Sequence, residues 1–344
     1  MKAAVIHEFG PPEVLKIEDV PAPSPASGEV LVRVRAVRVG GMLDIGTRAG
    51  RNPFARLTFP HVLGSDFAGD VVEVGGGVTT LQRDDRVAVS PFITCGECPA
   101  CRSGREYGCP NAQLVGVHRP GSYAELTAVP AKVVRRIPEG MTYAQAAALA
   151  LSGPVACTQF SVVGLKKDDW VLVTAAASGL GLVTAQVARA LGARVIATSR
   201  KDWKREELRK RGFANVLDTE DEGFAAQVGQ LTGGAGVAIA IDNTASAAMF
   251  PKVCASLARL GVIVSSGAQV AELVPLDVRS LYLKSQSIIG IRTHTEAALD
   301  GFWTLAAGGF ETLVDREFAL EEVAEAHRYV QAEKNFGRVL LKLD

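Results

Sequence analysis

The first third of the chain alternates apolar and polar residues with a period of two, which is typical of β-strands with one buried face. The clearest case is 30–37 (VLVRVRAV), while 67–74 (FAGDVVEV) and 86–89 (RVAV) are rich in β-branched residues. Turn signals separate these runs, among them three glycines at 75–77. Several short strands divided by turns predict a partly closed barrel.

The pattern changes near residue 150, where short apolar strands begin to alternate with helical segments. A strand at 170–174, a turn of small residues, a helix through 191 and a strand at 194–198 follow one another. Such alternation predicts a parallel sheet that is covered by helices. The other elements expected are strands at 238–242, 261–265 and 338–343 and helices at 296–307 and 320–334.

Composition and charge narrow the class of protein. A chain of 344 residues suggests two domains, and 48% hydrophobic and 22% charged residues are ordinary for a folded protein. Basic and acidic residues both number 37, and this balance argues against a general nucleic-acid binder. No apolar run approaches the roughly 18 residues of a membrane span, and His7 and Glu8 interrupt the start where a signal peptide is apolar. We expect a cytoplasmic protein that binds neither membranes nor nucleic acids.

Four of the six cysteines lie close together in the spacing C-x2-C-x2-C-x7-C, as Cys95, Cys98, Cys101 and Cys109. Zn²⁺ takes four thiolates in a tetrahedron, and such short spacings let one loop surround the ion. Four cysteines leave no coordination position open, so the site would be structural. Disulfides are disfavoured in a cytoplasmic chain, and a cysteine-ligated iron–sulfur cluster is the other alternative. We expect one structural zinc ion per chain.

A loop of small residues, 175–181 (AAASGLG), follows the strand at 170–174 and opens a helix. It is an imperfect match to the dinucleotide motif G-x-G-x-x-G, since alanine stands at the first glycine position. Small residues let a phosphate approach the backbone, and the helix N-terminus supplies free N–H groups. A tight strand–helix turn without a ligand is the alternative. The candidate phosphate contacts are Ser178, Gly179, Leu180 and Gly181.

The next predicted strand is followed by Ser199, Arg200 and Lys201, about 20 residues after the loop. NAD enzymes usually place an acid here for the ribose hydroxyl, whereas the 2′-phosphate of NADP favours a cation. The first acid in this segment is Asp202. The pattern therefore favours NADP(H), with a solvated basic loop as the alternative.

The chain resembles the medium-chain dehydrogenase/reductase superfamily, and its quinone-oxidoreductase-like, zinc-binding branch in particular. The resemblance covers essentially the whole chain. Besides the cysteine loop and the 175–181 loop, it rests on MKAAVIHEFGPPEVLKIEDV, GEVLVRVRAV, HVLGSDFAGDVVEVGGGV, GSYAEL, SIIGI and FGRVLLKL.

This resemblance implies an α/β fold with two domains. A GroES-like β-barrel catalytic domain would comprise 1–151 and 290–344, and a Rossmann doubly wound parallel sheet would span 152–289. Members of the superfamily are commonly homodimers or homotetramers. The family's cofactor positions add Asn243, Ser266, Gly267, Ala268, Arg292 and Arg338. Arg338 would face phosphate, and a strand-edge cation is the alternative.

The resemblance fails at the second zinc site of alcohol dehydrogenases, which is catalytic. Its cysteine ligand belongs near Gly40-Gly41, and its histidine belongs where Ser65 stands before Asp66. A third ligand near 151–155 is also missing, and one carboxylate cannot hold a catalytic zinc ion. His61 is better explained as a backbone partner at the start of a strand than as a ligand. We expect no zinc in the active site.

Without that metal, the acceptor must be positioned and polarised by side chains. The candidates implied by homologous position are Asp44, Ser65, Asp66 and His294. Asp44 is either a general acid or a structural carboxylate paired with Arg48. His294 either protonates the product or is a surface histidine in front of the 296–307 helix.

Three functions compete. The first is an NADPH-dependent reductase that transfers hydride to a conjugated carbonyl, such as an enone, or to a quinone. The second is a carbonyl reductase or alcohol dehydrogenase of the same fold. The third is a crystallin-like or RNA-associated relative without activity, against which the neutral charge counts. We favour the first, because an enone or quinone needs no metal to become electrophilic.

Overall fold

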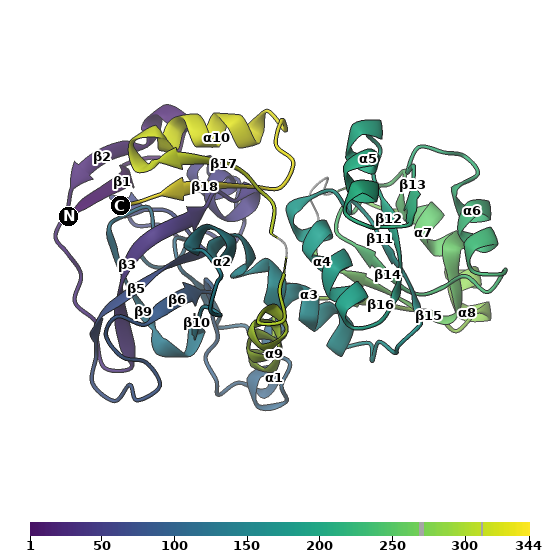
Figure 1. Cartoon of the computed structure of the whole chain (residues 1–344), viewed down its shortest axis with the longest axis horizontal. Coiled ribbons are helices and arrows are strands. Elements are labelled where there is room, and N and C mark those ends of the chain that lie inside the picture. The colour runs from purple at the N-terminus through teal and green to yellow at the C-terminus, as the bar shows by residue number, and fades with distance from the viewer. Residues whose placement is uncertain (268–271, 311) are drawn as a thin grey trace. The chain divides into compact units, whose positions relative to one another are not determined.

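The computed structural model describes residues 1–267, 272–310 and 312–344. The chain forms two compact units (Figure 1). The barrel unit comprises Met1–Leu151 and Ala306–Asp344, and the sheet unit comprises Ser152–Leu305. Both chain termini belong to the barrel unit.

The barrel unit is built mainly from antiparallel strands. Its largest sheet has the order β10-β6-β5-β3-β18-β17, with β9 also paired to β3, and a three-stranded sheet has the order β2-β1-β4. The C-terminal strand β18 pairs with β3, so segments from the two ends of the chain share one sheet. The strands are β1 Lys2–Ile6, β2 Lys16–Asp19, β3 Glu29–Arg38, β4 His61–Val62, β5 Phe67–Val74, β6 Arg86–Val89, β7 Phe92–Ile93, β8 Gln113–Leu114, β9 Leu126–Pro130, β10 Val134–Arg136, β17 Val314–Ala319 and β18 Arg338–Lys342.

Alternating valines of β3 fill the core of this unit. Val30, Val32 and Val34 are fully buried, whereas Arg33 between them is exposed, as the period-two pattern predicts. The unit's helical segments are short: η1 Pro12–Val14, η2 Gly41–Gly46, α1 Pro99–Arg102, η3 Glu106–Gly108, η4 Ala131–Val133, α2 Tyr143–Leu149, η5 Leu320–Glu322 and α10 Val323–Gln331.

The sheet unit contains one six-stranded parallel sheet in the order β13-β12-β11-β14-β15-β16. In sequence order this is 3-2-1-4-5-6, the doubly wound arrangement. The expected α/β fold class, a barrel beside a parallel sheet, is confirmed. The strands are β11 Trp170–Val173, β12 Arg194–Thr198, β13 Asn215–Leu217, β14 Val237–Asp242, β15 Leu257–Ser265 and β16 Ser287–Gly290.

Helices connect these parallel strands, and α4 contacts β11 and β12 while α7 contacts β14 and β15. The helices are α3 Ser152–Ser161, α4 Gly179–Ala190, α5 Asp202–Lys210, α6 Phe224–Leu231, α7 Phe250–Ser256, α8 Val278–Leu283 and α9 Glu296–Ala306. In the described ranges, no helix is long and apolar enough to span a membrane.

The first boundary between the units falls after Leu151, at the expected position. The second falls after Leu305 rather than after 289, because the segment that leads into α9 is attached to the sheet unit. The backbone N–H of Thr295 donates to Oγ1 of Thr158 in α3 at 3.1 Å, and both residues belong to that unit. Residues 290–305 therefore pack with the parallel sheet.

Candidate functional site

The small-residue loop lies between β11 and the N-terminus of α4, as its sequence predicts. Ser178 caps the helix, and its Oγ accepts the backbone N–H of Gly181 at 3.1 Å. A Cβ on Gly181 would lie only 2.2 Å from the carbonyl oxygen of Ala175, so this position requires glycine. Gly179 and Leu180 complete the first turn of the helix, where free N–H groups favour a phosphate.

Other predicted cofactor residues follow the carboxyl ends of the neighbouring strands. Asn243 follows β14, and Ser266 and Gly267 follow β15. In a doubly wound sheet the ligand binds beyond these strand ends, where the strand order reverses between β11 and β14. Ala268 lies outside the described residues.

Buried polar atoms without a partner mark the same edge of the sheet. Nδ2 of Asn243, Oγ of Ser266 and Oγ1 of Thr293 are enclosed and make no hydrogen bond in the described chain. Buried polar atoms are normally hydrogen-bonded, so such orphans call for a missing partner. The hydroxyl and amide groups of a dinucleotide are suitable partners. The residues present therefore fit a nicotinamide cofactor.

The chain after β16 places two further candidates differently. Arg292 is exposed, whereas His294 is buried and its Nδ1 donates to the carbonyl oxygen of Thr295 at 3.1 Å. The interpretation of His294 as a surface histidine is therefore wrong.

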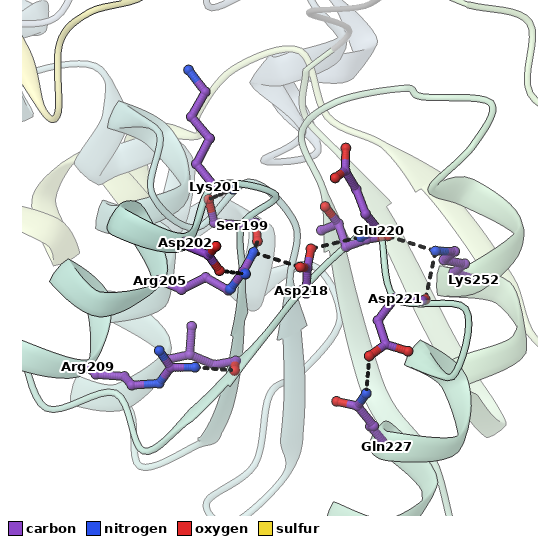
Figure 2. A network of polar contacts seen from close by, with 12 residues as sticks. Ser199, Lys201, Asp202, Arg205, Arg209, Asp218, Glu220, Asp221, Gln227 and Lys252 are labelled. Atoms are coloured by element: carbon purple, nitrogen blue, oxygen red, sulfur yellow. Dashed lines mark hydrogen bonds and ion pairs between the residues drawn. The ribbon is translucent and has the colours of Figure 1, made fainter.

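Figure 2 shows the segment after β12, where a buried arginine gathers the nearby acids. Arg205 of α5 donates from Nη1 to the carbonyl oxygen of Ser199 at 2.9 Å and pairs with Asp218 at 3.0 Å. Its Nη2 pairs with Asp202. The two carboxylates nearest to Ser199 are thus engaged by a cation of the protein itself.

The segment contains two further cations, Arg200 and Lys201, and the backbone N–H of Lys201 donates to Oγ of Ser199 at 3.4 Å. Arg200 is exposed, and Lys201 is half-buried and precedes the first residue of α5. The Lys201 side chain extends away from Arg205 (Figure 2). Two cationic residues therefore follow the end of β12, where the ribose of a dinucleotide is recognised.

The catalytic candidates of the barrel unit surround a buried ion pair. Arg38 ends β3, and Asp66 immediately precedes β5. Nε of Arg38 donates to Oδ2 of Asp66 at 2.5 Å, and Nη2 donates to Oδ1 at 2.6 Å. The Asp66 side chain is fully buried and that of Arg38 is 10% exposed. Burial by itself would lower the pKa of Arg38, but the Asp66 carboxylate raises it, so the guanidinium stays charged.

Asp44 and Ser65 adjoin this ion pair. Oδ2 of Asp44 accepts the backbone N–H of Gly40 at 2.6 Å, while Oδ1 is buried without a partner in the described chain. The Ser65 hydroxyl lies 2.9 Å from Oδ1 of Asp66 and 3.4 Å from Oδ2 of Asp44, and it can donate its one proton to only one of them. Burial raises the pKa of Asp44 to about 7, Arg38 opposes this shift and Asp66 adds to it. Asp44 thus exchanges its proton near neutral pH.

Arg338 begins β18, opposite Gly40 in the register of β3 and β18. Because β18 lies between β3 and β17, the strand-edge interpretation of Arg338 is wrong. Its Nε is buried and has no partner in the described residues. Burial, reinforced by Arg38, lowers the pKa of Arg338 to about 9.

Two local expectations about side-chain partners have opposite outcomes. His61 starts β4, and its Nε2 lies 3.2 Å from the carbonyl oxygen of Gly116, so the backbone-partner interpretation is confirmed. The pairing of Asp44 with Arg48 is wrong. Nη2 of Arg48 instead lies 3.4 Å from Oε1 of Gln331, because Asp44 folds back onto the N–H of Gly40.

The four clustered cysteines form a compact sulfur site. Their Sγ atoms all lie within 4.8 Å of one another, and three pairs are 3.5, 3.6 and 3.9 Å apart. A tetrahedron with Zn–S bonds of about 2.3 Å has S···S separations of about 3.8 Å. None of the four forms a disulfide in this structure, so the disulfide alternative finds no support. The donor set and its spacing fit Zn²⁺. The four are Cys95, Cys98, Cys101 and Cys109.

In the described parts of the chain, this is the one group of three or more Cys, His, Asp or Glu residues arranged to hold a metal. Position 40 has no room for a cysteine ligand. A Cβ on Gly40 would lie 2.5 Å from Nη1 of Arg38 and 2.8 Å from Oδ2 of Asp44. A guanidinium and a carboxylate thus border the place where alcohol dehydrogenases bear a ligand.

A parallel dinucleotide-binding sheet, a barrel and a four-cysteine loop define a dehydrogenase-type oxidoreductase. Residues 26–139 match the alcohol dehydrogenase GroES-like domain, and 179–307 match the zinc-binding dehydrogenase domain. The chain is 32% identical to an alcohol dehydrogenase of Geobacillus stearothermophilus and 29% identical to a NAD-dependent alcohol dehydrogenase of Sulfolobus acidocaldarius, each over the full length of both chains. The protein belongs to the medium-chain dehydrogenase/reductase superfamily, in its zinc-binding alcohol dehydrogenase type.

Solved structures agree with this family. The structure of AibC superposes with a TM-score of 0.93 at 34% identity, over 99% of this chain and 95% of that one. A mycobacterial quinone oxidoreductase superposes with a TM-score of 0.84 at 29% identity, over the full length of both.

Sequence reasoning overlooked three site residues. Arg38 looked like one more polar residue after an alternating strand, and its partner lies 28 residues away. Thr293 and Gln159, whose Nε2 donates to Oδ1 of Asn243 at 3.2 Å, carry no motif. A buried-strand arginine beside a missing metal ligand is the signal that could have identified Arg38.

We predict one tightly bound zinc ion per chain, held by the four clustered cysteines. Cys98→Ser should abolish that zinc and lower the Tm by roughly 5 °C or more, because a closed metal site contributes folding energy. Cys254→Ser, at a half-buried free thiol, is the matched control and should keep the zinc. Metal analysis and thermal unfolding check this, and two zinc ions per chain would contradict it.

We also predict that ionisation of Asp44 lowers the free energy of unfolding as the pH rises. Its pKa is about 7 in the folded protein, above its ordinary value of 3.8. The stability associated with its proton is fully present below pH 4 and is lost between about pH 4 and 7, on the order of 1 kcal/mol per pH unit. Asp44→Asn should therefore gain stability relative to the parent as pH rises from 4 to 8.

Denaturant unfolding at several pH values measures this difference. Asp84→Asn, at an exposed turn, controls for the loss of one carboxylate. An Asp44→Asn difference that is the same at pH 4 and pH 8 would show that Asp44 ionises normally.

Proposed function

We propose that the protein is an NADPH-dependent reductase of a conjugated carbonyl or a quinone, with a structural zinc and no zinc at the acceptor site. The observation that carries this proposal is the Arg38–Asp66 ion pair beside Asp44. The Asp66 carboxylate is bound to Arg38 and the Asp44 carboxyl group is bound to the N–H of Gly40, so neither is available as a ligand for a catalytic metal. Hydride transfer must then proceed by hydrogen bonding and proton donation alone.

Each unit has its own task in this scheme. Bound NADPH supplies the hydride. The N–H groups of Gly179 and Leu180 at the start of α4 would hold the pyrophosphate, and the orphaned groups of Asn243, Ser266 and Thr293 would orient the rest of the cofactor. Asp44 holds a proton near neutral pH and can give it to the reduced acceptor.

A conjugated acceptor suits a site of this kind. Oxidising an alcohol requires removal of its proton, which zinc makes acidic in metal-dependent enzymes. Conjugation already spreads the incoming charge from the β-carbon of an enone onto its oxygen. Preorganised donors at that oxygen are then sufficient, each contributing roughly 2.7–4 kcal/mol.

A carbonyl reductase or alcohol dehydrogenase without a catalytic zinc is the second candidate. One observation favours it, since a pKa of about 7 lets Asp44 act as a base as well as an acid. The relatives named alcohol dehydrogenases point the same way. The two candidates differ in the acceptor and share the same proton-exchanging group.

The preference for NADPH rests on charge at the end of β12. Arg200 and Lys201 offer cations, and Arg205 neutralises Asp202 and Asp218. An acid that is held by Arg205 is a poor acceptor for both ribose hydroxyls of NADH. The Sulfolobus relative is named as NAD-dependent, so this preference would be a point of divergence within the family.

Assembly into homodimers or homotetramers remains a prediction. Strand β16 ends the order of the parallel sheet, and apolar side chains are exposed on it and on α8. They include Tyr282, Leu283 and Ile288, which are 78%, 55% and 40% exposed.

The cofactor preference is tested by dissociation constants. We expect NADPH to bind more tightly than NADH, and Arg200→Ala to weaken NADPH selectively by about 10-fold or more, because a charge-assisted contact contributes on the order of 1.5–3 kcal/mol. Lys210→Ala removes a cation from the far end of α5 and should leave both constants unchanged. Equal binding of the two cofactors by the parent protein would refute the preference.

The reaction is tested with an enone, a quinone, an aldehyde and a primary alcohol. The enone or quinone should give the highest kcat/KM, and added chelator or zinc should not change it, because no step uses a metal. Dominant alcohol oxidation that survives chelation would select the second candidate. Alcohol oxidation that depends on added zinc would contradict both.

A further inference from the structure

Arg38 has N–H groups beyond those that the ion pair uses. Its Nε and Nη2 donate to Asp66, and no partner for Nη1 exists in residues 1–267, 272–310 and 312–344. Nη1 is not sealed from solvent, in contrast to Nε of Arg338. Asp66 thus fixes the orientation of the Arg38 guanidinium, and the Nη1 group can still donate a hydrogen bond.

The surface beside this free group is open. Gly40 has no side chain to cover Nη1, and a Cβ on Gly41 would meet nothing within 4 Å. Gly41 is exposed, and the following Met42 is 51% exposed. The two residues that follow Gly40 are therefore exposed, and Gly40 itself adjoins Nη1.

The charges around Arg38 favour an anionic group at that point. When Asp44 carries its proton, two guanidinium groups, Arg38 and Arg338, are balanced by one carboxylate, Asp66. Among the described residues, the buried Tyr123 also interacts electrostatically with Arg38, Asp44 and Asp66, and it interacts with Arg48 as well. An unbalanced positive charge in a partly dehydrated site stabilises negative charge that develops on an acceptor.

We propose that Arg38 is a catalytic residue whose Nη1 group donates a hydrogen bond to the acceptor's carbonyl oxygen and stabilises the charge that develops there. This role deepens the proposed function and rests on it. It assigns to a side chain of β3 the polarising task that a metal ion performs in zinc-dependent enzymes.

The proposed step is balanced in atoms and electrons. Hydride from NADPH forms a C–H bond at the β-carbon of the enone, and the C=C π pair moves so that negative charge collects on the carbonyl oxygen. Arg38 stabilises this enolate by hydrogen bonding and remains protonated. The α-carbon then takes a proton from Asp44, which regains one from water.

The direct test observes carbonyl polarisation without turnover. The probe is 4-(dimethylamino)cinnamaldehyde, an enal whose visible absorption moves to longer wavelength when its carbonyl oxygen is polarised. It is added to the zinc-loaded protein together with NADP⁺, which cannot deliver hydride, and with a chelator. We expect a red shift in the parent protein that the chelator does not remove.

Three variants of the ion pair separate donation from folding. Arg38→Gln should abolish the red shift, and Arg38→Lys, which keeps one charged donor without the planar fork, should retain part of it. Because Arg38→Gln leaves the buried Asp66 carboxylate without its cationic partner, with only the Ser65 hydroxyl among the described residues still donating to it, the double variant R38Q/D66N replaces the ion pair by an uncharged pair that can fold. It too should lose the shift.

Arg35→Gln is the matched control. Arg35 lies on the same strand and pairs with Asp70 through Nε at 2.8 Å, outside this cluster. It should keep the parent's red shift and activity. A parent-like shift in a folded R38Q or R38Q/D66N protein would overturn the proposal, as would an equal loss in Arg35→Gln.

Kinetics distinguish failure of this role from failure of the proposed function. With an enone, R38Q/D66N should lower kcat by about 10²–10³-fold, the effect of removing one oxyanion donor, and should leave the dissociation constant of NADPH unchanged. An active enone reductase with unchanged kcat in that variant would refute the role of Arg38 alone. A red shift that depends on Arg38, in a protein that reduces only simple aldehydes, would refute the enone assignment alone.

Discussion

The ion pair between Arg38 and Asp66 is the constraint around which the barrel unit's polar cluster is arranged. Taking two charges out of water is costly, and such a pair persists only when its geometry satisfies both groups. Here the register of β3 and β5 provides that geometry. Val37 pairs with Phe67, and the N–H of Arg38 donates to the carbonyl oxygen of Asp66 at 3.0 Å. The side chains of Arg38, which follows Val37, and Asp66, which precedes Phe67, are thereby brought together.

Other features of the cluster follow from the place that the guanidinium occupies. A side chain at residue 40 would require Arg38 and Asp44 to shift, because its Cβ would lie 2.5 Å from Nη1 of Arg38 and 2.8 Å from Oδ2 of Asp44. The absence of a side chain leaves the N–H of Gly40 accessible to Asp44, which is buried there and gains its raised pKa. Pairing of β18 with β3 then adds Arg338 beside the same group. The Arg38–Asp66 contact thus contributes to the electrostatics of two neighbouring side chains, Asp44 and Arg338.

The elements with a clear periodicity were predictable from the sequence, and the long-range pairs were not. Strands β3, β5, β6 and β12 and helix α4 lie within one or two residues of their expected bounds. A short strand with little pattern, such as β13, was not predicted because neighbours across the sheet stabilise it. The four cysteines and the loop before α4 were predictable because each feature lies within one short stretch of sequence.

The errors share one physical cause. Asp44 and Arg48 have the spacing of an ion pair on an α-helix, but the segment forms a turn of π type at Gly41–Gly46 and Asp44 turns back to Gly40. The strand-edge alternative for Arg338 fails because β17 covers the outer side of β18, which the sequence does not reveal. An irregular turn determines the partner of Asp44, and a contact between distant segments determines the surroundings of Arg338.

The balance of charge also indicates why this site differs in reactivity from a zinc site. A metal ion polarises an oxygen strongly and makes a bound alcohol acidic. A guanidinium already neutralised by Asp66 exerts a weaker pull and has no proton to lose. It can assist an acceptor whose own conjugation delocalises charge, while the proton comes from a carboxyl group that titrates near neutrality. Relatives with the same fold can therefore be named alcohol dehydrogenases while the residues of this chain favour reduction of a conjugated acceptor.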